Sequence, residues 1–110
     1  MANPQKAKGD RAEREVVALI AEHTGIECRR GKAGHARDQG DVHGLPDVTV
    51  QVKDYVDVVR AVREGLDKLD EQMAENGDPF GAAFIRRRGG EYVVCMRPAQ
   101  FFALWRETQG

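Results

Sequence analysis

The sequence predicts an α/β protein of one domain, residues 1–110, in which a single mixed β-sheet is flanked by helices. Three observations predict this fold: segments with apolar residues at helical spacing, a segment in which valines alternate with polar residues, and two strand-like segments joined by a glycine pair. With 41% hydrophobic and 32% charged residues, the chain can bury a core without a disulfide or a metal. The expected order of elements is α-β-β-β-α-β-β-α.

Helical and extended patterns alternate along the first third of the chain. Apolar residues in 9–23 recur at helical spacing, and Gly25 ends that helix. Residues 1–6 are expected to form a mobile tail. Residues 26–30 (IECRR) predict a short strand, and 31–40, which is rich in glycine and basic residues, predicts a flexible loop.

The rest of the chain predicts further strands, a long helix and a short one. Apolar residues follow three-four spacing over 56–76, which is typical of an amphipathic helix. Gly89-Gly90 predicts a hairpin turn between the last two strands, and Pro98 opens the last helix. The expected strands are 41–44, 48–53, 82–88 and 91–96.

Charge and composition argue against several classes of protein. The net charge of −1 argues against a protein that coats nucleic acid through bulk charge. No apolar run is long enough to span a bilayer, and the N-terminus lacks the apolar core of a signal peptide, so we expect a cytoplasmic protein with no membrane partner. Cys28 and Cys95 lack metal-ligand spacing and are expected to be reduced, buried hydrophobic residues.

Basic residues cluster in two places although the whole chain is nearly neutral. The first cluster is Arg29, Arg30, Lys32 and Arg37, and the second is 86–88. Local basic clusters on a nearly neutral protein are typical of a protein that binds a polyanion at one site. Ordinary solvated loops explain the same pattern, so these clusters do not decide the function by themselves.

The strand at 48–53 carries polar residues that a buried strand does not need. Alternation places the valines on one face, and the other face carries Asp47, Thr49, Gln51 and Lys53. One explanation is an amphipathic strand with one face in water. The other is a functional face, with the valines in the core and the polar row turned toward a phosphodiester and its metal. Asp41 adds a carboxylate one strand earlier.

A glutamate on the first predicted helix points to the same region. Val16, Val17 and Ile20 surround Glu13 on one helical face, so its carboxylate is expected to face the sheet. A capping or helix-dipole role explains Glu13 without any site. Carboxylates from a helix and a strand, close to Lys53, would suit a hard metal such as Mg²⁺, which takes oxygen ligands.

Three short motifs occur in order along this half of the chain: KGDRAERE at 8–15, GDV at 40–42 and QVK at 51–53. Together they resemble the PD-(D/E)XK nuclease superfamily, and most closely its small archaeal-type Holliday junction resolvases and their phage-encoded relatives. The resemblance covers residues 8–54 and the elements that follow. It implies a restriction-endonuclease-like core, dependence on Mg²⁺ and a DNA substrate.

The resemblance implies a role for each matching residue. Glu13 falls on the helix glutamate that assists metal binding, and Asp41 falls on the metal-binding aspartate. Lys53 falls on the lysine that positions the attacking water and stabilises charge on the phosphate. Gln51 stands where the family has Glu or Asp, so its amide oxygen would be a metal ligand without negative charge. Asp47, in a literal Pro-Asp, is the alternative to Asp41.

Basic residues of the helix motif and of the loop are expected to hold the DNA backbone, and two histidines are considered with them. His35 is expected to contact phosphate or solvent, and His43 is a lower-ranked candidate for the site. The expected DNA-binding residues are Lys8, Arg14, Arg29, Arg30, Lys32, His35 and Arg37.

The resulting expectation is a Mg²⁺-dependent DNA endonuclease, for which Mn²⁺ can substitute, that resolves four-way junctions by attack of metal-activated water. It would act in recombination and repair in a bacterial, archaeal or phage-infected cell. Paired cuts favour a homodimer, with its seam on the apolar stripe of 56–76 or on Phe101, Phe102 and Trp105. Two alternatives stay open: a nicking or repair nuclease of the same fold, and a DNA-binding or assembly module with weakened catalysis.

Overall fold

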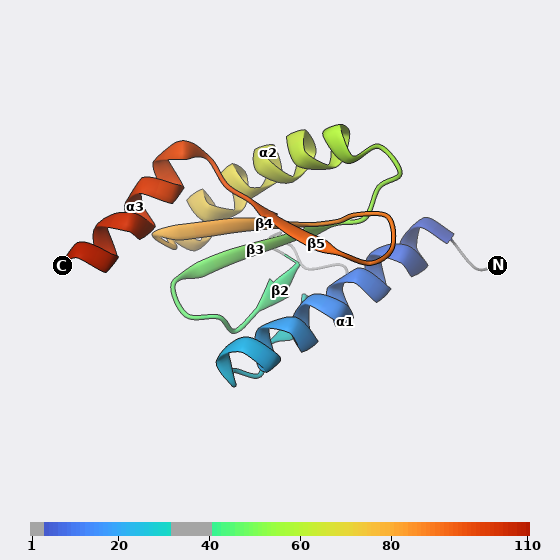
Figure 1. Cartoon of the computed structure of the whole chain (residues 1–110), viewed down its shortest axis with the longest axis horizontal. Helices are drawn as coiled ribbons and strands as arrows, with labels where there is room; N and C mark the ends of the chain where they lie inside the picture. The colour runs from blue at the N-terminus through green and yellow to red at the C-terminus, as the bar shows by residue number, and fades with distance from the viewer. Residues whose placement is uncertain (1–3, 32–40) are drawn as a thin grey trace.

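The fold is a five-stranded mixed sheet with α1 and α2 on opposite faces (Figure 1). This computed structural model describes residues 4–31 and 41–110. The expected α-β-β-β-α-β-β-α order is confirmed. In chain order, the elements are α1 (Pro4–Thr24), β1 (Arg29–Arg30), β2 (Val42–His43), β3 (Val48–Lys53), α2 (Val58–Asn76), β4 (Phe80–Arg86), β5 (Tyr92–Cys95) and α3 (Pro98–Gln109).

The central strands β3 and β4 determine which face of the sheet α2 covers. They run parallel, with Val48 opposite Phe80 and Lys53 opposite Ile85, and α2 makes the connection between them. The other neighbouring strands pair antiparallel, and the strand order in the sheet is β1-β2-β3-β4-β5. A parallel pair needs a crossover connection, and here the crossing helix packs on both strands.

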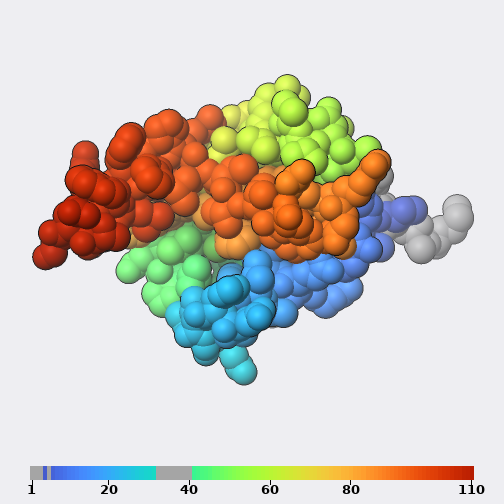
Figure 2. Space-filling model, viewed as in Figure 1, coloured from blue at the N-terminus to red at the C-terminus, as the bar shows by residue number. Residues whose placement is uncertain are grey.

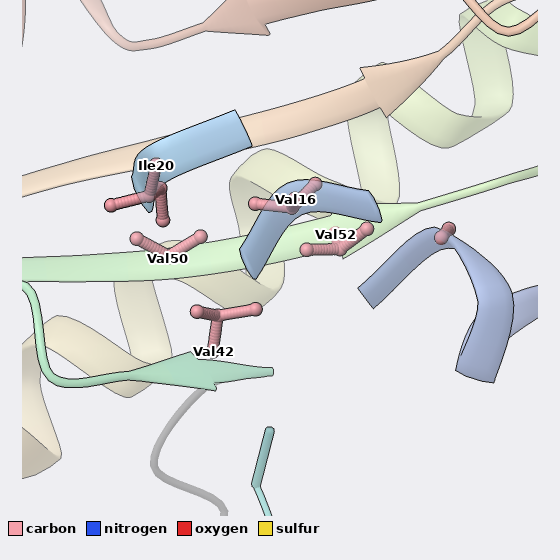
Figure 3. Close-up of a cluster of buried hydrophobic side chains, with 6 residues drawn as sticks. Val16, Ile20, Val42, Val50 and Val52 are labelled. Carbon is pink, nitrogen blue, oxygen red and sulfur yellow. The ribbon is translucent and has the colours of Figure 1, made fainter. Parts of the chain in front are cut away.

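One half of the core lies between α1 and the valine face of β3, as Figure 3 shows. The alternate valines of β3 meet residues spaced three to four positions apart on α1, so the two periodicities of the sequence match across the interface. The buried side chains of this cluster are Ala12, Val16, Ile20, Val42, Val50 and Val52. The expected burial of the valine row is confirmed.

The other half of the core lies under α2, where small residues let the helix approach the sheet. Ala61 of α2 packs with Ala83 and Ile85 of β4. Leu69 of α2 is fully buried and lies over Gly81 of β4, where a side chain would have no room. This packing brings α2 over the polar row of β3.

Both ends of α2 are closed by residues just outside it. The side chain of Asp57 accepts a hydrogen bond from the Arg60 backbone N–H at 3.1 Å, so the helix begins at Val58 and not at 56 as expected. At the other end, Gly77 has a left-handed backbone (φ 72°) and donates its N–H to the Met73 carbonyl at 2.8 Å. The predicted end of this helix is confirmed.

The first helix is longer than the sequence pattern predicts. α1 starts at Pro4, so residues 4–6 belong to a helix and not to the expected tail. Proline is favourable in the first turn, and the following Gln, Lys and Ala are good helix formers. These residues carry no apolar spacing, and for that reason the pattern misses them.

The strands before β3 are shorter than expected. β2 covers 42–43 where 41–44 was predicted, because Gly44 leaves the strand with a positive φ of 113°. β1 covers 29–30 where 26–30 was predicted, since it can pair only along its short neighbour. Residues 32–40, most of the expected flexible loop, lie outside the described residues.

The predicted turn at Gly89-Gly90 is confirmed. Both glycines have positive φ angles, 88° and 85°. The Arg87 N–H donates to the Glu91 carbonyl at 2.7 Å, and the Gly90 N–H donates to the Arg87 carbonyl at 3.0 Å. The turn therefore takes up Arg87 and Arg88, and β4 ends at Arg86 and not at 88 as expected.

The C-terminal helix α3 projects from one end of the molecule (Figure 2). Its start is fixed by Arg97, which donates to Asp67 at 2.9 Å and to Asp70 at 3.0 Å on α2. No residue of α3 is buried, and its aromatic side chains are exposed. Among the described residues, no helix combines the length and the apolar character needed to cross a membrane.

We expect Gly81→Ala to destabilise the protein by about 1–3 kcal/mol through overpacking. A Cβ atom at this position would clash with the Met73 sulfur and would lie 2.9 Å from Leu69 Cδ1. The matched control is Gly9→Ala in α1, where a Cβ meets no atom within 4 Å. Because alanine favours helix, the control should gain about 0.5–1 kcal/mol. Urea unfolding measures both, and equal stability of the two variants would contradict the close approach of α2.

Candidate active site

Asp41 is held against the second half of β3. Its carboxylate oxygen Oδ2 accepts a hydrogen bond from the Val52 backbone N–H at 2.8 Å. Its own backbone N–H donates to the Val50 carbonyl at 3.0 Å, and its carbonyl accepts from the Gly31 N–H at 2.9 Å. Asp41 therefore has a fixed place just before β2, next to the β3 residues that precede Lys53.

Glu13 approaches the same place from α1, and it is bound to an arginine. Glu13 Oε1 accepts from Arg30 Nε at 3.1 Å, and Arg30 Nη2 donates to Asp10 Oδ1 at 2.6 Å. Burial raises the pKa of Glu13, and the negative charges of Asp41 and Asp10 add to this effect against the opposing influence of Arg30. Burial is the largest of these influences on the pKa of Glu13, and the charge of Asp41 acts in the same direction.

Gln51 lies on the other face of β3, beneath α2. It is 1% exposed, and its Nε2 has no hydrogen-bond partner among the described residues. The neighbouring Thr49 is also buried, donates to Asp78 Oδ2 at 2.8 Å and accepts from Asn76 at 3.0 Å. The expectation that the whole polar row faces a ligand is wrong for Thr49, which joins the sheet to the end of α2, and Gln51 lies under a helix and not on an open face.

Lys53 follows at the end of β3 and is partly exposed. Its stem lies next to Gly65 of α2, and its Nζ is 5.8 Å from the centre of the Tyr55 ring. The ammonium group therefore lies on the α2 side of the sheet, whereas Glu13 comes from the α1 side. A substrate that met both residues would have to bind across the end of the sheet where β3 finishes.

Asp47, the alternative to Asp41, lies at the opposite end of β3. It is an exposed turn residue with a left-handed backbone (φ 66°), and its carbonyl accepts from the Phe80 N–H at 3.2 Å. Asp47 directly precedes β3, and Lys53 is the sixth and last residue of this strand, so the two lie about 20 Å apart along an extended strand. This geometry favours Asp41 over Asp47.

The expected DNA-binding residues are partly engaged in ion pairs. Lys8 Nζ lies 3.9 Å from Asp54, and Arg30 bridges Asp10 and Glu13. Arg14 is exposed on α1, and Arg29 is exposed on β1 opposite His43, which is partly buried. Three expected residues lie outside the described part of the chain: Lys32, His35 and Arg37.

A second ionic cluster, which the sequence patterns did not predict, is centred on Asp54. The Asp54 side chain is 8% exposed and lies 3.3 Å from Arg11 and 4.0 Å from Arg86, in addition to Lys8. Alternation places Asp54 on the same face as Val50 and Val52. A carboxylate at the end of an apolar row is the sequence feature that could have indicated a buried ionic contact here. The cluster holds the first turns of α1 to the end of β3.

Glu15 and Tyr92 extend this cluster to the β4–β5 hairpin. Glu15 Oε1 accepts from Tyr92 OH at 2.7 Å and from Arg86 Nε at 2.9 Å. The bond from Tyr92, together with Arg86, holds the pKa of Glu15 below its usual value. Burial, reinforced by the bond to Glu15, raises the pKa of Tyr92, so the phenol stays protonated and acts as a donor at neutral pH.

The donor set for a cation is limited. Within residues 4–31 and 41–110, no three His, Cys, Asp or Glu side chains form a group that could hold a metal ion. Two carboxylates from separate segments remain as candidates, Glu13 and Asp41, and the negative charge of Asp41 contributes to the raised pKa of Glu13. Such a pair fits an oxygen-preferring cation that takes the remainder of its ligands from water and substrate, as Mg²⁺ usually does.

We expect Asp54→Ala to cost about 1–2 kcal/mol, because Lys8 and Arg11 lose the counter-charge that ties α1 to the end of β3, whereas Arg86 keeps its bond to Glu15. The matched control is Glu91→Ala, which breaks an exposed pair with Arg87 within the hairpin and should change stability by no more than about 0.5 kcal/mol. Guanidinium unfolding measures both variants. If Asp54→Ala were as mild as the control, Asp54 would not fix α1 to the sheet.

In comparisons with known proteins, no family model, no curated protein and no solved structure matches this chain.

Proposed function

We propose that the protein is a Mg²⁺-dependent endonuclease for branched DNA, and in particular a Holliday junction resolvase. The observation that carries the proposal is the position of Asp41: its carboxylate accepts a hydrogen bond from the Val52 N–H, one residue before Lys53, and its charge contributes to the raised pKa of Glu13 on α1. These three residues match the motifs of the PD-(D/E)XK nucleases in order. The parallel β3–β4 pair, preceded by α1 and antiparallel β1–β3, supports a restriction-endonuclease-like core.

The proposed metal ligands are Asp41, Glu13 and the amide oxygen of Gln51. When bound, Mg²⁺ would polarise the phosphate and lower the pKa of the attacking water, and Mn²⁺ would serve in its place. Asp41 and Glu13 supply the negative charge of the site. Lys53, on a flexible stem at the end of β3, adds positive charge to stabilise the phosphate as its charge grows.

The proposed DNA contacts surround this place. Arg29 of β1 and Arg14 of α1 are exposed, and Arg30 is partly exposed. The Gly31 N–H and the Asp41 carbonyl, which are hydrogen-bonded, flank the segment with Lys32, His35 and Arg37 in the sequence. Because the net charge of the whole chain is only −1, binding would depend on these local contacts and would weaken with salt.

A second candidate function is a DNA-binding or assembly module with weakened catalysis. The observation in its favour is Gln51, which is neutral and buried where the resembled family carries a carboxylate. A nicking or repair nuclease of the same fold stays an alternative within the enzyme class. Cutting patterns separate the three: symmetric cuts confined to junctions, cuts in any branched DNA, or binding without cuts.

We further propose that the protein acts as a homodimer whose seam is α3. Most of the apolar stripe of α2 covers the sheet, since Leu69 is buried and Val62 and Leu66 pack on the core, whereas Val59 at its start is exposed. On α3, by contrast, Phe101 and Phe102 are each 54% exposed and Trp105 is 53% exposed. Exposed apolar surface of this kind is typical of an interaction site, and two symmetric cuts need two linked active sites.

We expect the protein to cut a synthetic four-way junction in Mg²⁺ and to stop in EDTA. Asp41→Ala and Lys53→Ala should lower the cleavage rate by at least about a hundredfold while DNA binding persists, because they remove a metal ligand and the charge that stabilises the phosphate. Asp47→Ala is the matched control, since it removes a carboxylate from the far end of β3. Cleavage is measured on gels against linear duplex and flap DNA.

Binding without cleavage in both Mg²⁺ and Mn²⁺ would favour the weakened module. Cleavage that survives Asp41→Ala but is lost in Asp47→Ala would move the site to the other end of β3.

We expect Trp105→Glu to convert a dimer into a monomer at micromolar concentration. Burying a charge at an aromatic seam should raise the dissociation constant by about a hundredfold or more. Val59→Glu is the matched control, because Val59 is 76% exposed on α2 and lies outside the proposed seam. Sedimentation velocity measures both. A wild type that is monomeric and still resolves junctions would contradict the proposed dimer.

A further inference from the structure

Arg30 of β1 binds two carboxylates of α1, and one of them is the proposed metal ligand Glu13. Asp10 and Glu13 are three residues apart, so they lie on one face of α1 one turn from each other. Arg30 Nη2 bonds Asp10 at 2.6 Å, and Arg30 Nε bonds Glu13 at 3.1 Å. A single planar guanidinium therefore spans the two carboxylates, and the shorter of the two bonds goes to the one that is not a proposed metal ligand.

In the proposed site, Arg30 and a divalent cation would compete for the carboxylate of Glu13. Its Oε1 is bonded to Arg30, whereas a divalent cation shared with Asp41 would need the same carboxylate as a ligand. A guanidinium and a divalent cation repel each other at short range, so a cation on Glu13 would weaken the bond from Arg30. Asp10 remains for Arg30 when Glu13 is taken, so the arginine can give up one partner without losing both.

We propose that Arg30 is the built-in counter-ion of this site: it holds Glu13 in the metal-free protein and is released toward a DNA phosphate when a divalent cation takes Glu13. This inference rests on the proposed function, and it adds a coupling between metal and DNA. Because binding free energies are reciprocal, a cation that frees Arg30 strengthens DNA binding, and bound DNA strengthens cation binding to the same extent. Arginine suits this exchange since its fork of donors fits carboxylates and phosphates alike.

The first test measures Mn²⁺ binding without DNA, by the loss of the free-ion signal in electron paramagnetic resonance. Arg30→Gln should bind Mn²⁺ about tenfold more tightly than wild type, because the competing cation is gone. Arg29→Gln is the matched control: it removes the same charge from the adjacent residue, whose side chain is exposed, and should change the affinity by less than about twofold. Thermal unfolding checks that each variant is folded.

Arg30→Lys keeps the charge without the fork that spans Asp10 and Glu13, and it serves if Arg30→Gln does not fold. It should tighten Mn²⁺ binding by about threefold, between wild type and the full removal of the charge.

The second test measures binding to a four-way junction at constant ionic strength, in EDTA and in Ca²⁺. The wild type should bind about fivefold more tightly in Ca²⁺, and Arg30→Gln should lose most of that gain. Arg63→Gln, which removes an exposed charge on α2, should keep it.

The outcomes separate this inference from the proposed function. If wild type binds Mn²⁺ and Glu13→Gln does not, but Arg30→Gln binds like wild type, the counter-ion role is overturned and the metal site stands. If wild type and Glu13→Gln bind Mn²⁺ equally, the metal site of the proposed function fails together with the inference. If Arg30→Gln tightens Mn²⁺ binding but wild type gains no junction affinity in Ca²⁺, the release of Arg30 to DNA is overturned.

Discussion

The structure depends on the burial of β3 on both of its faces. Its valines pack against α1, and Thr49 and Gln51 lie under α2, so neither face is open to water. A strand enclosed in this way must match two helices at once, and its side chains then position everything at its end. Asp41 is bonded to its backbone at Val52, and Lys53 and Asp54 follow on opposite faces.

The helix α1 makes two separate sets of ionic contacts on adjacent faces. Asp10 and Glu13 turn toward β1, where they meet Arg30. Arg11 and Glu15 turn toward the end of β3 and the β4–β5 hairpin, where they meet Asp54 and Arg86 and Tyr92. On the first face, two carboxylates bind Arg30. On the second face, basic side chains surround the carboxylate of Asp54. A single helix thus serves as the edge of the candidate site and as the anchor that keeps this edge in place.

The sequence predicts the helices and strands that have strong periodicity, but it does not predict which helix covers each face of the sheet. The three-four spacing of 58–76 and the alternation of 48–53 identify α2 and β3 because each pattern repeats several times. β1 and β2 have two residues each, which is too short for any period to show. The polar residues of β3 suggested an open face, but alternation does not reveal that a crossing helix covers it. The parallel pairing of β3 with β4 does, and that pairing is a tertiary contact.

The candidate site shows the same division. Motif order predicts that Glu13 and Asp41 belong to one site, whereas the bond of Arg30 to Glu13 depends on how β1 lies against α1 and has no local signal in the sequence. Asp54 ends an apolar row in the sequence, yet its partners come from α1 and β4, far away along the chain.

Gln51 has a consequence for how the protein folds. A neutral amide beneath α2 costs little to bury compared with a charge, so this chain can reach its native state before any cation is present. A carboxylate at that position would have to be neutralised by a proton or a metal, and folding stability would then rise with cation concentration as for any ligand that binds only the native state. With Gln51 in this place, the sheet can be complete before a cation reaches the proposed ligands Asp41, Glu13 and Gln51.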